Sequence, residues 1–289
     1  MKTGMNHIAA IVLNYNSNED LFRCVKLLKN QRGICLSIIV VDNCSNRDSK
    51  DELEDWIKKE NEIYFISNNE NKGYSAGNNI GLKLATKIGA KASLIVNPDM
   101  IIENINYIQI LSDEMFLTEN CAICSSRIKT LEGNDQNPLR ESTFFEELFW
   151  IRSLVKPISY ILPIKETRSI EVPKVSGCCL LINNKFLQKI NYLDENVFLY
   201  CEEPILSAQV KKEGYKIIYI PTIEAIHAHI KSEKGNDSKR MLEMIKSRKY
   251  YLRKYSDYPL NKIILLEISY KILESIYKMK IWRQNGENT

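Results

Sequence analysis

Short apolar runs alternate with amphipathic stretches over the first hundred residues of the chain. The runs at 8–13, 36–41, 62–66 and 93–96 are rich in β-branched residues and too short to be typical helices. Apolar runs of this length are typical of strands that are buried on both faces of a parallel sheet. We therefore expect four buried strands in this part of the chain.

The stretches between these runs have the spacing of amphipathic helices. In residues 18–30 and 75–89 apolar side chains recur every three or four positions, and residues 48–59 open with acids that favour a helix start. The predicted order is β-α-β-α-β-α-β. This order favours an α/β fold with a doubly wound, mostly parallel sheet and right-handed crossovers.

The pattern is less regular after residue 102. Residues 130–170 show no clear period, and a loop-rich segment of that length in a compact fold is usually functional or mobile. The elements that we expect in this part are helices at 104–118, 184–190, 237–256 and 260–283, and strands at 121–125, 176–182, 216–220 and 223–230.

Composition narrows the class of protein. Of the 289 residues 44% are hydrophobic and 26% charged, as in ordinary globular proteins, and a net charge of +4 does not indicate a nucleic-acid partner. The chain lacks the apolar core of a signal peptide, long apolar stretches and paired zinc-type cysteines. We expect a cytoplasmic protein with reduced thiols and no membrane-spanning helix.

Polar clusters follow all four predicted strands. They are "NYN" at 14–16, "DN" at 42–43, "NNENKG" at 68–73 and "NPD" at 97–99. Ligands of doubly wound sheets bind beyond the carboxyl ends of the strands, where these clusters fall. We therefore expect a binding site at this edge of the sheet.

Each candidate residue at this edge also has a structural interpretation. Asp42 suits hydrogen bonds to a nucleobase or ribose but also a helix cap, and Asp99 suits a metal but also a turn. Gly73 and Gly77 lack the spacing of a dinucleotide loop, yet they allow a diphosphate to approach a helix start closely.

Acidic and histidine residues add candidate chemistry further along the chain. Glu202 and Glu203 suit the first turn of a helix, but an adjacent carboxylate pair can also raise one pKa and supply a general base. His227 and His229 share one face of a predicted strand, where they are either structural or metal ligands.

Taken in order, these clusters resemble the family 2 glycosyltransferases, and most of all the bacterial rhamnosyltransferase-like branch that builds surface polysaccharides. The resemblance covers residues 7–235 and implies a Rossmann-like GT-A fold. It also implies inverting transfer from dTDP-rhamnose or a UDP-hexose, with manganese or magnesium, to a glycan or lipid-linked oligosaccharide. The matching segments are "IVLNYNSNEDLFRCVKLL", "IIVVDNCSN", "NNENKGYSAGNNIGL", "LIVNPDM", "VSGCCLLI", "FLYCEEPILSAQVKKEGY" and "IHAHIKS".

The resemblance implies roles for individual residues. Asp99 and His227 would hold the metal, with Asn97 in place of the first acid of the family's DxD motif. Glu203 would be the catalytic base, with Glu202 beside it in the catalytic site. The implied donor-site residues are Asn14, Tyr15, Asn16, Asp42, Asn71, Gly73, Asn78 and Asn97.

Some positions depart from the family pattern. Glu203 stands in place of an aspartate, and Ile205 and Gln209 replace a common acid and a common arginine. These departures leave a second hypothesis open, in which the chain is a nucleotide-sugar-binding pseudoenzyme or scaffold in a polysaccharide assembly complex.

The expected organisation is a glycosyltransferase domain at 1–235 and a helical extension at 236–289. The domain would divide into a nucleotide-binding half at 1–102 and an acceptor and catalytic half at 103–235. An apolar stripe with lysines around it favours packing on the domain or on a second subunit of a homodimer, or else contact with the anionic inner face of the plasma membrane. The stripe consists of Ile264, Ile268, Ile272, Leu273 and Ile276.

Overall fold

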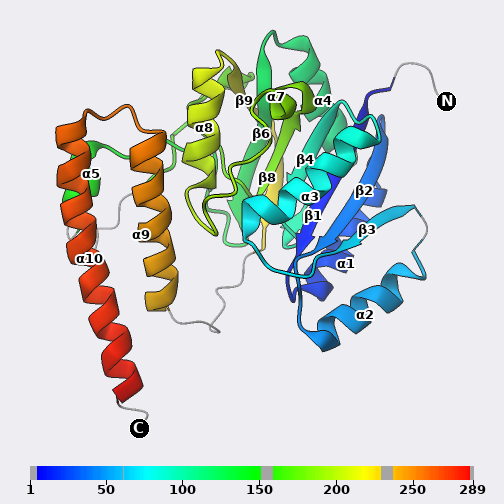
Figure 1. Cartoon of the computed structure of the whole chain (residues 1–289). Helices are drawn as coiled ribbons and strands as arrows, with labels where there is room; N and C mark the ends of the chain where they lie inside the picture. Colours follow the sequence, from blue (N-terminus) through cyan, green and yellow to red (C-terminus); the bar gives the residue numbers. More distant parts are fainter. Residues whose placement is uncertain (1–4, 61, 151–158, 229–236, 287–289) are drawn as a thin grey trace.

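The structure is a computed structural model that describes residues 5–60, 62–150, 159–228 and 237–286. In these residues a nine-stranded sheet lies between two layers of helices (Figure 1). The strands are β1 His7–Asn14, β2 Cys35–Asp42, β3 Ile63–Ser67, β4 Ala92–Val96, β5 Met100–Ile101, β6 Cys121–Thr130, β7 Ile170–Glu171, β8 Cys179–Asn183 and β9 Lys216–His227. The helices are α1 Asn18–Lys29, α2 Arg47–Ile57, α3 Tyr74–Lys87, α4 Tyr107–Leu117, α5 Phe144–Leu148, α7 Asn184–Lys189, α8 Glu202–Lys212, α9 Asp237–Lys254 and α10 Leu260–Gly286.

The first half of the sheet confirms the predicted strands. β3, β2, β1 and β4 are neighbours in that order and run parallel. Side chains alternate along β1, so that Ala9 and Ile11 face the core formed with α3, α7 and α8, while Ala10 and Val12 face the core formed with α1, α2 and α4. All four of these side chains are fully buried, as expected of a strand that is covered on both faces.

The second half of the sheet is mixed. β8 runs antiparallel to both β4 and β6, and β6 is parallel to β9. The expectation of separate strands at 216–220 and 223–230 is wrong, because β9 is one strand with Pro221 in its interior. The pairing with β6 shifts register between Ile220 and Glu224, and such a bulge accommodates a proline that cannot donate to the ladder.

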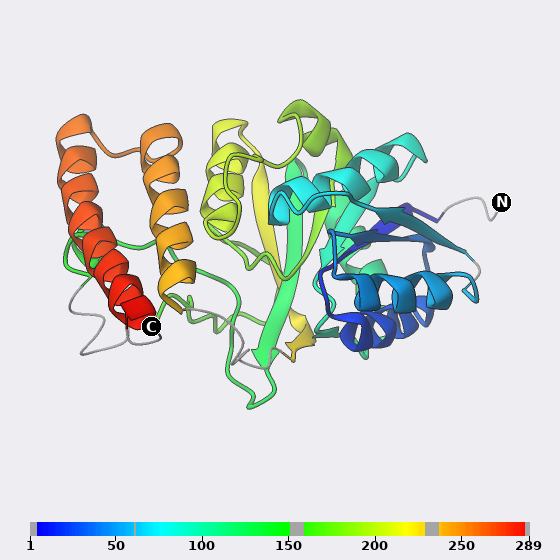
Figure 2. The same cartoon turned by 60° about the horizontal axis from the view of Figure 1, so that its bottom comes forward.

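The helices α9 and α10 pack side by side at the end of the molecule away from the N-terminus (Figures 1 and 2). Tyr270 and Leu273 of α10 are buried in a separate small core that also includes residues of α5 and α9. In contrast, Ile264, Ile268 and Ile272 of the predicted stripe are 48%, 51% and 56% exposed. α10 therefore carries one buried and one exposed apolar face. No helix in the described part of the chain is both long and apolar enough to cross a membrane.

Candidate active site

The turn after β4 places Asp99 beside the end of β9. The backbone N–H of Asn97 donates to the carbonyl of Cys178 at 2.8 Å, and β5 then pairs with β9 so that Met100 lies opposite His227. This register brings Oδ2 of Asp99 to 3.2 Å from Nε2 of His227, with both side chains mostly buried. The structure thus brings together the two residues that the resemblance assigns to a metal, although they lie far apart in the sequence.

Gln136 contacts the other nitrogen of the His227 ring. Oε1 of Gln136 lies 2.8 Å from Nδ1 of His227. Because an amide oxygen only accepts, this contact favours the tautomer that carries its proton on Nδ1, and the lone pair of Nε2 is then directed at the Asp99 carboxylate. An imidazole lone pair and a carboxylate that are directed at one another are groups that can coordinate a divalent cation together. In the described residues no group of three or more His, Cys, Asp or Glu side chains is placed to hold a metal, and this corner brings together two such side chains.

Asn14 and Asp42 end the neighbouring strands β1 and β2, and both are fully buried. Asp42 accepts hydrogen bonds from the hydroxyl and backbone N–H of Ser45 at 2.6 and 3.2 Å, and from Nδ2 of Asn14 at 3.4 Å. These bonds shape the loop between β2 and α2. Tyr15 and Asn16 directly follow Asn14. Tyr15 is 53% exposed, and Asn16 adopts the left-handed region with φ 54°.

Gly73 directly precedes α3 and packs closely against the segment before α8. Its φ is 98°, and an added Cβ would lie 2.1 Å from the carbonyl oxygen of Phe198, so only glycine fits here. The same carbonyl accepts a hydrogen bond from the backbone N–H of Tyr74 at 2.9 Å. Asn71 accepts from the Gly73 N–H at 2.9 Å, and the buried Asn78 donates to the Tyr74 carbonyl at 3.0 Å. Three predicted donor-site residues therefore lie along one loop and helix start.

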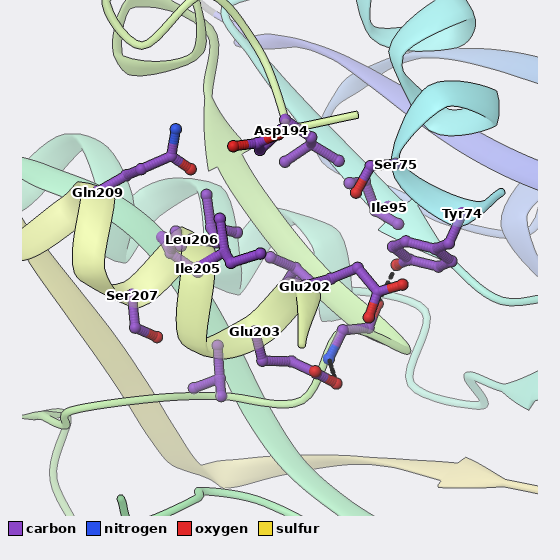
Figure 3. A pocket seen from close by; sticks show the side chains of 15 residues that line it. Tyr74, Ser75, Ile95, Asp194, Glu202, Glu203, Ile205, Leu206, Ser207 and Gln209 are labelled. Atoms are coloured by element: carbon purple, nitrogen blue, oxygen red, sulfur yellow. Dashed lines mark hydrogen bonds between the residues drawn. The ribbon is translucent and has the colours of Figure 1, made fainter. Parts of the chain in front are cut away.

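Glu202 and Glu203 open α8, and both line a small cavity of about 20 Å³. Glu202 is the more enclosed: its carboxyl lies beside the Tyr74 ring (Figure 3), and its Oε1 is buried without a hydrogen-bond partner in the part of the chain that the structure describes. Glu203 accepts a hydrogen bond from the backbone N–H of Gly177 at 3.2 Å. The carbonyl of Gly177 accepts from the Tyr74 hydroxyl at 2.6 Å, so α3 and α8 are both tied to this glycine.

The environment of Glu202 favours its neutral form. Burial, and after it the charge of Glu203, raises the pKa of Glu202 to about 7. The chain enters α8 through Tyr200 and Cys201, which both adopt the left-handed region, with φ of 70° and 67°. Adjacent non-glycine residues in this region are strained, and such strain concentrates at functional sites.

The Asp99–His227 corner and the carboxylate pair are neighbours. Asn97, which begins the turn that carries Asp99, is bonded through its N–H to Cys178. The preceding residue, Gly177, holds the carboxylate of Glu203. The turn that carries Asp99 and the carboxylate of Glu203 are therefore both bonded to the segment at Gly177 and Cys178.

Sequence reasoning did not identify three residues that support this site. Gln136 lies in the aperiodic segment 130–170 and gave no signal. Tyr74 and Gly177 fall inside the segments that carry the family resemblance, but their contacts with the carboxylate pair depend on how α3 and β8 pack. His229, the second histidine of the pair, lies outside the described residues.

Comparisons with known proteins concern the family and the fold of the chain. A model of "Glycosyl transferase family 2" matches residues 9–190. The low-salt glycan biosynthesis hexosyltransferase Agl10 of Haloferax volcanii is 28% identical over 229 residues, which are 78% of this chain and 68% of that protein.

Two solved structures are similar in fold. GalNAc-T7 with UDP, GalNAc and Mn2+ has a TM-score of 0.67 at 14% identity, over 89% of this chain and 50% of that one, so this chain spans half the length of that protein. The mannosyltransferase PcManGT from Pyrobaculum calidifontis, in complex with GDP-Man and Mn2+, has a TM-score of 0.62 at 14% identity, over 93% and 70%. At such identities the likeness concerns the fold alone, and it confirms the predicted GT-A fold.

Proposed function

The chain belongs to glycosyltransferase family 2, and from this premise we propose that it is an inverting enzyme of glycan biosynthesis. It would move a sugar from a nucleotide-diphosphate sugar to a hydroxyl of a glycan or lipid-linked acceptor. The observation that supports this most is the contact chain from Asp99 and His227, through Cys178 and Gly177, to Glu203. The proposed cation ligands would then lie next to a carboxylate at the edge of the sheet where ligands bind.

On the donor side, Asp99 and His227 would hold manganese or magnesium. A bound cation supplies positive charge that stabilises the departing nucleoside diphosphate, whose oxygens complete the metal shell. Asn14 and Asp42 are buried. The exposed ring of Tyr15, which follows Asn14 in the chain, offers a surface on which the nucleobase can stack. dTDP-rhamnose and a UDP-hexose remain the two candidate donors.

Glu203 is the proposed catalytic base. Inversion proceeds by one in-line displacement, in which a base accepts the proton of the attacking hydroxyl. The N–H of Gly177 fixes the orientation of the Glu203 carboxylate. Glu202, with its pKa raised to about 7, is mostly protonated below neutral pH and there adds little negative charge beside the base.

A thermal-shift screen of UDP-, dTDP- and GDP-sugars with and without manganese tests this proposal. A donor that binds the native state raises the melting temperature, and the rise should require manganese and vanish in Asp99→Ala. Sugar transfer is then measured with the donor that binds. Binding without transfer over a broad acceptor panel would favour the pseudoenzyme hypothesis, and no shift with any donor would refute the proposed donor site.

We also propose a peripheral contact between α10 and an anionic membrane on its cytoplasmic side. Trp282 is 77% exposed, Ile268 and Ile272 are 51% and 56% exposed, and Lys271 and Arg283 add positive charge to the same helix. The protein should co-sediment with anionic but not with neutral vesicles, and Ile268→Glu should abolish this. Dimerisation in size-exclusion chromatography that is lost in Ile268→Glu would instead support the homodimer alternative.

A further inference from the structure

A cavity of about 370 Å³ lies between the helical extension and the start of α8. Residues of α5, α9, α10 and the first turn of α8 form its walls, and Figure 1 shows α9 standing between α8 and α10. Aromatic and aliphatic side chains dominate the lining, among them Trp150, Tyr160, Met241, Met244 and Tyr277. Such a lining suits a ligand with a large apolar surface.

The charged side chains of the same lining are neutralised within the protein. Each of them has a partner of opposite charge, and the most buried is Glu147, whose two oxygens accept hydrogen bonds from Arg248. Side chains that satisfy one another in this way offer little to an ionic ligand or to the hydroxyls of a sugar ring. The pairs are Arg248–Glu147, Arg140–Glu146 and Lys174–Glu141.

The cavity extends to the helix that carries the proposed base. Cys201 and Pro204, the residues on either side of Glu202 and Glu203, both belong to its lining. Ser247 of α9 donates a hydrogen bond at 2.7 Å to a backbone carbonyl of the segment just before α8. α9 is therefore attached to the segment that precedes Glu203, and the cavity borders the first turn of α8.

We infer that this cavity binds the hydrocarbon chain of a lipid-linked acceptor and so brings the acceptor hydroxyl toward Glu203. The inference rests on the proposed function, since it names the acceptor class of that site. The neutralised charges and the apolar lining favour a hydrocarbon chain over a sugar ring. The exposed apolar face of α10 lies on the same helical extension, where a chain drawn from a membrane would arrive.

Fluorescence quenching tests the location of the chain. The probe is dibromododecyl maltoside below its critical micelle concentration, with unbrominated dodecyl maltoside as the reference, because bromine quenches only a nearby indole. We expect quenching in the parent and in Trp282→Phe, and its loss in Trp150→Phe. Quenching that survives in Trp150→Phe, or that disappears in Trp282→Phe, would overturn the inference and place the chain elsewhere.

A cavity-filling variant tests the consequence for binding and is independent of the donor. Met244→Phe should weaken binding of the probe by about tenfold, while Met279→Phe on the exposed face of α10 should leave it unchanged. Equal affinity in both variants would overturn the inference. If probe binding follows these expectations but no nucleotide sugar shifts the melting temperature, the cavity assignment stands and the proposed function fails; the reverse result removes the cavity assignment alone.

Discussion

The Asp99–His227 corner and the Glu202–Glu203 pair differ in how distance along the chain relates to position in the fold. Asp99 and His227 are far apart in the chain, yet the pairing of β5 with β9 brings them to 3.2 Å. Glu202 and Glu203 are adjacent and line one cavity, yet Oε1 of Glu202 is buried without a hydrogen-bond partner in the described part of the chain, while Glu203 accepts a hydrogen bond from the Gly177 N–H. Strand register can thus build one site from distant residues, while a helix start can give neighbouring residues separate chemical environments.

This difference predicts separate consequences for substitutions at the two places. Loss of Asp99 or of His227, the two proposed ligands, should change the metal requirement, because the two side chains approach each other to 3.2 Å. Substitution of Glu203 should lower the rate of transfer. Substitution of Glu202 should mainly change the stability of the fold and the dependence of that stability on pH. The variants below test this distinction, from the largest expected effect on the transfer rate to the smallest.

Glu203→Gln should lower kcat by on the order of 10³-fold, because the amide keeps the shape of the side chain but cannot accept the acceptor proton. The rate is measured at saturating donor and manganese. Glu213→Gln at the end of α8 is the matched control and should keep the parent rate. If the kcat of Glu203→Gln were within about tenfold of the parent value, Glu203 would not be the catalytic base.

Asp99→Asn should lower the transfer rate by about a hundredfold and raise the manganese concentration needed for half-maximal activity. The reason is that an amide is a weaker ligand than a carboxylate, so part of the charge stabilisation of the departing diphosphate is lost. Asp113→Asn on the exposed surface of α4 serves as the control. An unchanged manganese dependence in Asp99→Asn would contradict the metal corner.

Gln136→Ala should weaken manganese binding by about tenfold, because the His227 ring loses the acceptor that fixes its tautomer. Gln136→Glu keeps an acceptor and should restore the affinity. The readout is the manganese concentration at which the donor raises the melting temperature. If Gln136→Ala and Gln136→Glu behave alike, Gln136 is not a positioning residue for His227.

The sequence predicted the parallel half of the fold well, because strands that are buried on both faces carry unbroken apolar runs and end in polar clusters. The proximity of Asp99 and His227 followed from the family resemblance alone, since the register of β5 against β9 has no local signal. Gln136 could not be predicted for the same reason. The stripe on α10 is divided between the two faces of the helix, with Leu273 buried and Ile268 and Ile272 exposed, because a helix with two apolar faces does not show from its spacing which one meets a core.

Glu202→Gln should change the transfer rate by less than about tenfold, since the amide resembles the neutral acid that the site favours. Its main effect should be on stability. The pKa of Glu202 is about 7 in the folded protein against an ordinary value of 4.5, so below pH 4.5 both states hold the proton and the group contributes nothing. As the pH rises from 4.5 to about 7 the unfolded state releases its proton first, and folding loses up to about 3 kcal/mol.

The Glu202→Gln variant should therefore match the parent in urea unfolding near the ordinary pKa and exceed it above pH 7, by up to about 3 kcal/mol. Glu213→Gln is again the control, because Glu213 ends the same helix and pairs with Lys189 at the surface. If Glu202→Gln retains the stability loss of the parent between these pH values, Glu202 is ionised in the folded state. The two adjacent carboxyls would then share one environment, and the contrast with the Asp99–His227 corner would not hold.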